Sequence, residues 1–168
     1  PLIFVEIALT QTLPASVTEL LSDQRQIVAM ERATTAVFYS ISNCQEGLRG
    51  VSFGNFLIKQ VVEDLRRELP GLNRFITLSP VPCLARWLHE KGHVSDHDDD
   101  TQRQEALKAH TLEYFFSARA ADGRHADPVA RFHLGNGARL ERSVWAADNS
   151  PKGQKQADGL RVNWRYTL

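Results

Sequence analysis

Cysteine is scarce in this chain of 168 residues: Cys44 and Cys83 are the two present, and they lie far apart in the sequence. Two distant cysteines exclude both a disulfide framework and a paired-cysteine metal or redox motif. Small, buried filler is the role we expect for them. Their scarcity fits a reducing compartment, and we expect a cytoplasmic protein.

Long hydrophobic runs and an excess of one charge are also lacking. No apolar stretch approaches the roughly 18 residues of a membrane span. The first residues lack the basic segment and cleavage site of a signal peptide. The 20 Lys and Arg residues balance 20 Asp and Glu residues. We therefore expect neither nucleic acid nor a membrane as the main partner.

The composition that is present is typical of a folded globular domain. Hydrophobic residues make up 42% of the chain and charged residues 24%, both near the average for such domains. A chain of this length can bury a core without disulfides or metals. We therefore expect a single domain over residues 1–168.

Strand-like and helix-like segments alternate along the chain. Runs rich in apolar and β-branched residues predict strands at residues 2–9, 35–42, 74–79, 140–145 and 160–166. Apolar residues at helical spacing or behind capping residues predict helices at residues 14–21, 55–69, 84–89, 101–117 and from 128 onward. Polar segments predict loops at residues 92–100, 118–127 and 148–158. This order indicates an α/β or α+β domain.

A glycine-bearing turn joins the second predicted strand to the longest clear amphipathic helix. It consists of Arg49, Gly50, Val51, Ser52, Phe53, Gly54 and Asn55. Glycines allow the backbone to approach a ligand closely, and the free N–H groups and dipole of a helix N-terminus favour anions. We interpret this turn as a seat for the pyrophosphate of a nucleotide-like ligand. An ordinary strand-to-helix turn remains the alternative, because neither common phosphate-binding glycine motif is present.

His89, Glu90, Lys91, Gly92 and His93 match the HExxH pattern of zinc hydrolases. His97 or Glu113 would be candidates for a third ligand. Glycine inside a helix costs about 1 kcal/mol, and a polar loop follows at once. We therefore expect the helix to end before His93, and we favour a solvated helix end over a metal site.

Two other polar residues stand at places where chemistry is common. Ser79 ends a predicted strand, where α/β sheets place their ligands, although a serine before proline is also a frequent helix cap. His133 lies between Phe132 and Leu134, so we expect it to be partly buried and neutral. A core histidine with one hydrogen bond is the alternative interpretation. Glu6 lies either at a sheet edge or toward a pocket.

Several segments, taken in chain order, resemble the malonyl-CoA decarboxylases. They are residues 4–9, 38–42, 45–51, 56–59, 78–82, 128–138, 145–148 and 159–166. The resemblance implies a GNAT-like acyltransferase fold, with a mixed central sheet flanked by helices. In the family a helical N-terminal domain precedes this one and contributes to oligomerisation. The resemblance therefore implies that this domain and part of the C-terminal end are absent here, and that the parent protein is a homo-oligomer.

The same resemblance implies roles for individual residues. The family's CoA-binding loop corresponds to residues 49–55, its catalytic serine to Ser79 and its catalytic histidine to His133. Ser40 and Tyr166 correspond to polar neighbours of the site. The implied reaction converts malonyl-CoA to acetyl-CoA and CO2, a step of fatty acid metabolism. It requires no metal or organic cofactor, because the thioester itself accepts the electrons.

The chain also departs from the family. Ser52 stands where some members carry Glu, and Cys83 with Leu84 stands where Gly-Phe is common, so we expect a side chain there to crowd the pocket. Residues 89–101 resemble no part of the family. Two other enzymes remain as alternatives: a CoA-dependent N-acyltransferase, and a zinc hydrolase that uses the HExxH pattern at His89. A CoA-binding module without catalysis is a third.

Overall fold

The computed structural model describes residues 3–43, 54–93 and 99–167. The strands are β1 (Ile3–Thr10), β2 (Thr35–Asn43), β3 (Arg74–Thr77), β4 (Ser79–Pro80), β5 (Arg139–Val144) and β6 (Arg161–Tyr166). The helices are α1 (Val17–Leu21), α2 (Gly54–Glu68), α3 (Leu84–Glu90), α4 (Asp100–Ser117), α5 (Pro128–Gly135) and α6 (Pro151–Ala157), with a 3₁₀ turn at Met30–Arg32. None of the described helices has the length and apolar content that crossing a lipid bilayer requires.

The six strands form one mixed sheet, which confirms the predicted fold class. Their order is β1-β2-β3-β6-β4, and β5 pairs with β6 outside this path. β2 and β3 run parallel, whereas the other pairs are antiparallel. Among the described strands β1 pairs only with β2, so Glu6 lies on an edge strand.

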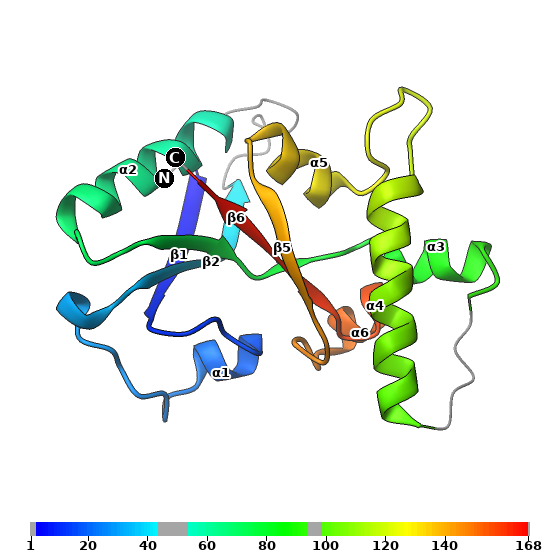
Figure 1. The fold of residues 1–168 in the computed structure, drawn as a ribbon, viewed down its shortest axis with the longest axis horizontal. Coiled ribbons are helices and arrows are strands. Elements are labelled where there is room, and N and C mark those ends of the chain that lie inside the picture. The colour runs from blue at the N-terminus through cyan, green and yellow to red at the C-terminus, as the bar shows by residue number, and fades with distance from the viewer. Residues whose placement is uncertain (1–2, 44–53, 94–98, 168) are drawn as a thin grey trace.

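The two faces of the sheet bury two separate sets of side chains. Alternation along β2 places Ala36 and Phe38 on one face and Val37 on the other. The first face forms the larger core with α2, α3, α4 and α5, and the second packs against α1 through Leu20. In Figure 1, α2 and α5 lie on one side of the sheet and α1 on the other, while α4 stands beside α3 at the far end from α2.

Capping residues start two of the helices. Helix α5 begins at Pro128 as predicted, whereas α1 begins at Val17, three residues after the predicted start at residue 14. The Ser16 side chain accepts a hydrogen bond from the backbone N–H of Glu19 at the start of α1. Asp127 does the same for α5, whose first residue is Pro128. These contacts satisfy N–H groups that have no partner within the helix. The predicted strand at residues 74–79 is divided into β3 and β4 around Leu78.

Helix α6 corrects the prediction of a polar loop at residues 148–158. Ser150 caps it by accepting a hydrogen bond from the N–H of Gly153, and Pro151 is its first residue. This is the same cap-then-proline pattern that marks α5. Gly153 is buried against Asp148, since a Cβ on Gly153 would lie 2.6 Å from the backbone oxygen of Asp148. The glycine that weakens the helical pattern is thus required by close packing.

Candidate functional site

Two parallel strands separate at the centre of the sheet and leave a cavity. The last paired residues of β2 and β3 are Phe38 and Thr77, after which the N–H of Leu78 donates to the Phe38 carbonyl (3.1 Å). β4 then pairs with β6 instead. The cavity between them has a volume of about 330 Å³, and its walls come from β2, β4 and α5: Phe38, Tyr39, Ser40, Ile41, Leu78, Ser79, Pro80, Pro128, Val129, Phe132 and His133.

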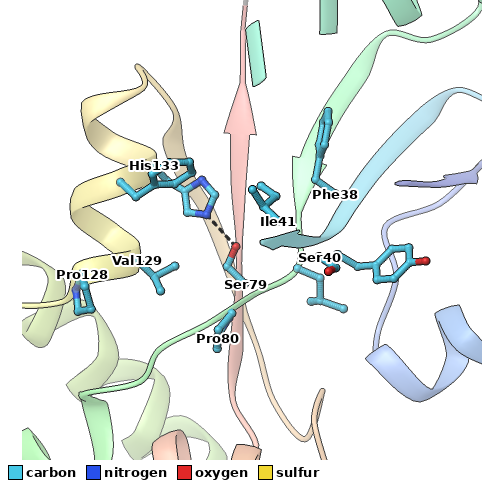
Figure 2. A pocket seen from close by; sticks show the side chains of 11 residues that line it. Phe38, Ser40, Ile41, Ser79, Pro80, Pro128, Val129 and His133 are labelled. Atoms are coloured by element: carbon cyan, nitrogen blue, oxygen red, sulfur yellow. Dashed lines mark hydrogen bonds between the residues drawn. The ribbon is translucent and has the colours of Figure 1, made fainter. Parts of the chain in front are cut away.

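Ser79 and His133 meet at this cavity although 54 residues separate them in the sequence. Ser79 Oγ lies 3.0 Å from His133 Nε2, and Figure 2 shows the two side chains pointing toward each other across the cavity. On the far side of the imidazole, the Tyr166 hydroxyl lies 2.7 Å from Nδ1. Ser79 Oγ also donates to Thr77 Oγ1 (2.7 Å). Four side chains therefore form one continuous chain of hydrogen bonds.

Burial sets the protonation of this chain. Desolvation lowers the pKa of His133 to about 3, so its imidazole is neutral near pH 7. Desolvation also raises the pKa of Tyr166, which keeps its hydroxyl protonated. With Tyr166 donating to Nδ1, Nε2 of His133 carries the ring proton and donates to Ser79 Oγ. His133 thus makes two hydrogen bonds, one more than the core-histidine alternative assumed.

Asp127 fixes the helix that carries His133. Its Oδ1 accepts hydrogen bonds from the N–H groups of Val129 (2.9 Å) and Ala130 (3.0 Å). Its Oδ2 accepts from the Tyr114 hydroxyl (3.2 Å) and from the Cys83 N–H (3.4 Å). One buried carboxylate therefore joins α5, α4 and the turn that follows β4. The sequence marks Asp127 as a cap, but its contacts with α4 and the turn depend on the fold.

Sequence reasoning missed two residues beside the Ser79–His133 pair. Trp164 stacks on His133 with ring centroids 5.7 Å apart and ring planes inclined by 21°. Thr77 Oγ1 accepts hydrogen bonds from Ser79 and from the N–H of Trp164 (3.1 Å). Alternation along β6 was an available signal for Trp164, since it places Trp164 and Tyr166 on the same face. Nothing in the sequence singles out Thr77.

The remaining predicted site residues fall into four groups. Ser40 lines the cavity, whereas Tyr166 lies behind His133 and is absent from the cavity wall. Arg49, Gly50, Val51, Ser52 and Phe53 lie outside the described residues, while Gly54 and Asn55 are the first two residues of α2. The predicted start of a helix at this turn is therefore confirmed, and its role in phosphate binding stays a prediction.

Cys83 does not crowd the cavity at Ser79, and the expectation that it would is wrong. It lines a different cavity of about 380 Å³, together with Arg86 and Trp87. The pKa of its thiol is raised, first by burial and then by the nearby charge of Asp127. The thiol is therefore protonated near neutral pH and is a poor nucleophile.

The HExxH pattern does not form the site of a zinc hydrolase. Helix α3 ends at Glu90, and Gly92 adopts a φ of 71°, so the expectation that the helix ends before His93 is confirmed. His89 is exposed, whereas His93 turns toward α4. Within the described residues, His93, His110 and Glu113 form the one group of three potential metal ligands, and it excludes His89 and Glu90.

Relatives of known sequence agree with this architecture. The family model described as the malonyl-CoA decarboxylase C-terminal domain matches residues 1–106 and 90–168. These ranges include residues 89–101, so the expectation that this segment resembles no part of the family is wrong. Mitochondrial malonyl-CoA decarboxylases from Anser anser anser and Rattus norvegicus are 33% and 32% identical to the chain over its whole length. The matches cover 42% and 43% of those two proteins, so the chain spans less than half the length of these relatives.

Solved structures show the same fold. Malonyl-CoA decarboxylase from Rhodopseudomonas palustris is 47% identical with a TM-score of 0.89, covering 99% of this chain and 44% of that one. The Agrobacterium vitis enzyme is 49% identical with a TM-score of 0.89, covering 100% and 47%. A GNAT-like decarboxylase, GphF, is 18% identical with a TM-score of 0.63, covering 99% and 72%, and shares the fold. The chain belongs to the family of malonyl-CoA decarboxylase C-terminal domains.

Proposed function

We propose that the protein decarboxylates malonyl-CoA to acetyl-CoA and CO2, with Ser79 and His133 as its catalytic residues. The observation that carries this proposal is the buried Ser79–His133 hydrogen bond at the wall of a cavity between separating strands. Ligands of open α/β sheets bind at such carboxyl ends of strands. The choice of decarboxylation as the reaction rests on membership of the decarboxylase family.

The substrate would provide the charge that turns His133 into an acid. Desolvation by the surrounding protein keeps the imidazole neutral. A malonyl carboxylate placed beside it favours the imidazolium, because a nearby opposite charge stabilises the charged form. Binding therefore takes up one proton. Since the cavity is largely apolar, conversion of the carboxylate to neutral CO2 relieves the cost of burying its charge.

The proposed reaction has two steps, loss of CO2 and protonation of the resulting enolate. The bond between Cα and the carboxylate breaks, CO2 leaves, and the electron pair moves into the thioester to form an enolate. Hydrogen-bond donors at the enolate oxygen stabilise it, and such electrostatic stabilisation commonly contributes more to the rate than any other effect. The Ser79 hydroxyl, which donates to Thr77 Oγ1 in the structure, would turn toward the substrate to become one of these donors. His133 Nε2 gives its proton to Cα, which produces acetyl-CoA and leaves a neutral imidazole with its proton on Nδ1. Proton exchange with solvent then restores the tautomer that carries the proton on Nε2.

Other parts of the chain would hold the rest of the substrate. Residues 49–55 and the start of α2 are our candidates for binding the CoA pyrophosphate, because a helix N-terminus favours anions. Ser40 lines the cavity on the β2 side. The chemistry needs no metal or organic cofactor. We further propose a cytoplasmic homo-oligomer, assembled through a domain like the N-terminal domain of the family.

The test is to incubate the full-length protein with malonyl-CoA in chelator and to follow acetyl-CoA by mass spectrometry. Ser79→Ala and His133→Asn should each lower turnover by about 10²–10⁴-fold, as loss of acid catalysis does, while CoA binding stays nearly intact. Near-normal turnover in His133→Asn would refute the assigned acid. Tight CoA binding without any acetyl-CoA would favour an N-acyltransferase or a binding module.

A further inference from the structure

A cluster of metal-ligand side chains lies away from the proposed substrate cavity, between the end of α3 and the middle of α4. We propose that His93, His110 and Glu113 bind a divalent transition-metal ion of the Zn²⁺ class, which joins the segment after α3 to α4. None of the three residues lines the cavity at Ser79. The inference is independent of the proposed decarboxylation.

The helical repeat and one turn bring these residues together. His110 and Glu113 are three residues apart on α4, so they share one face of that helix. His93 reaches them because the chain reverses at Gly92, whose φ of 71° favours glycine. Trp87 of α3 packs against the His93 ring, with centroids 5.7 Å apart. The cluster therefore spans two elements whose relative position a packed core already fixes.

The distances between the ligand atoms of the three side chains suit coordination of a shared ion better than they suit direct hydrogen bonds. Glu113 Oε2 lies 3.5 Å from His93 Nε2 and 3.7 Å from His110 Nδ1, and one ligand atom from each residue lies within 4.8 Å of the others. These separations exceed those of good N–H···O bonds. Ligand atoms at about 2.0–2.2 Å from a tetrahedral Zn²⁺ lie roughly 3.3–3.6 Å from one another, so rotation of the side chains would close the site.

The two imidazoles lie face to face. Their rings stack with centroids 3.9 Å apart and planes inclined by 20°, so a shared ion requires the rings to rotate until both nitrogens point at it. Two histidine nitrogens and one carboxylate suit Zn²⁺ and leave a coordination position for water. Side-chain exposures of 28%, 29% and 49% for His93, His110 and Glu113 let an ion enter from solvent.

The other residues of the HExxH pattern, His89 and Glu90, provide control substitutions for a metal-binding experiment. Metal-free, tag-free full-length protein should be titrated with Zn²⁺ by calorimetry and with Co²⁺ by visible absorption. We expect Co²⁺ bands typical of low-coordinate nitrogen and oxygen ligands, one ion per chain, and a higher Tm with Zn²⁺. His110→Gln and Glu113→Gln should each weaken binding at least about tenfold, since even outer-shell changes cost 10–100-fold.

His89→Gln and Glu90→Gln are the matched controls and should bind as the unmodified protein does. Circular dichroism of each metal-free variant shows whether the fold is kept, and His93→Gln provides a third ligand variant. The proposal is overturned if the unmodified protein binds no ion at micromolar concentration, or if His110→Gln binds normally. It is equally overturned if His89→Gln loses the ion, because the ligands would then be the two histidines of the HExxH pattern.

Discussion

At the scale of single residues, the environment of His133 determines what it can do. An apolar setting and two hydrogen-bond partners hold its ring in place and keep it neutral. In the proposed mechanism, the same desolvation would make its imidazolium a strong acid once the substrate carboxylate is bound. Histidine is a common residue. What distinguishes His133 is its burial between Ser79, which bonds to Nε2, and Tyr166, which bonds to Nδ1.

The lowered pKa of His133 predicts a pH dependence of stability. An unfolded histidine titrates near 6.5, whereas the folded value is about 3. Above pH 6.5 the group is neutral in both states. As the pH falls below 6.5 the unfolded chain gains a proton that the folded chain does not, so stability drops by about 1.4 kcal/mol per pH unit, until the pH nears 3.

Urea unfolding of the unmodified protein and of His133→Asn at pH 7.5 and 5 measures this effect. The difference in unfolding free energy between the two proteins should shrink by about 2 kcal/mol on going to pH 5. Other groups, such as the buried His125 whose pKa is also lowered by desolvation, contribute equally in both proteins and cancel. An unchanged difference would mean that the folded imidazole titrates normally.

Tyr166→Phe tests the hydrogen bond behind the imidazole. The variant removes the donor to Nδ1, so the ring loses the partner that selects its tautomer. We expect kcat to fall about tenfold, the equivalent of one hydrogen bond, with KM nearly unchanged because Tyr166 is absent from the cavity wall. Steady-state kinetics with malonyl-CoA separate the two parameters. An unchanged kcat, or a rise in KM alone, would contradict the assignment.

At the scale of elements, α6 shows how a weak helical pattern becomes a helix. Asp148 accepts hydrogen bonds from both Arg161 Nη2 (2.7 Å) and the Ser150 N–H (3.1 Å). Burial opposes its charge, but these hydrogen bonds still lower the pKa of Asp148. Arg161 in turn donates to the Leu78 carbonyl (2.8 Å), next to Ser79. The start of α6 is therefore tied to the strand that places Ser79 at the cavity.

Gly153→Ala should destabilise the protein by about 1–3 kcal/mol, the usual cost of overpacking. The added Cβ would lie 2.6 Å from the backbone oxygen of Asp148, so the helix or the loop before it must move. Chemical denaturation measures the loss. Gly135→Ala in α5 is the matched control, because an added Cβ there meets no atom within 4 Å. Equal effects of the two substitutions would argue against tight packing at α6.

At the scale of the whole molecule, the separation of β2 from β4 creates the site. The parallel pair ends at Phe38 and Thr77, and β6 then takes over the pairing. Helix α5 closes the resulting gap and supplies His133. The cavity therefore forms only when β2, β4 and α5 are all in their folded positions.

We expect CoA to raise the free energy of unfolding by the same amount whether or not the side chains of Ser79 and His133 are present, because neither is proposed to bind CoA. At a concentration 100 times its Kd, a ligand of the folded state adds about 2.7 kcal/mol. We expect similar Tm increases for the unmodified protein, Ser79→Ala and His133→Asn in thermal melts with CoA. A variant that loses the increase would place its residue in CoA binding rather than in the chemical step.

Local signals in the chain were enough to predict most of the elements. They suffice for α2, because helical spacing and the following Pro70 act within a few residues. The same holds for the cap at Asp127, which precedes Pro128. Likewise, the resemblance of segments in chain order identified the family and marked Ser79 and His133 before any contact was known. Helix α6 was missed although Ser150 and Pro151 form the same local pattern as the start of α5, because Gly153 and two lysines leave no apolar spacing behind that cap.

Which residues meet, by contrast, depends on the folded chain. Ser79 and His133 are 54 positions apart, and the hydrogen bonds to Thr77 and Tyr166 require three strands and a helix to be in register. The same is true of His93 and Glu113, which only the packing of α3 against α4 brings together. Periodicity and capping are local properties of the chain, whereas desolvation and convergence of side chains arise from contacts between distant segments, so no local pattern encodes them.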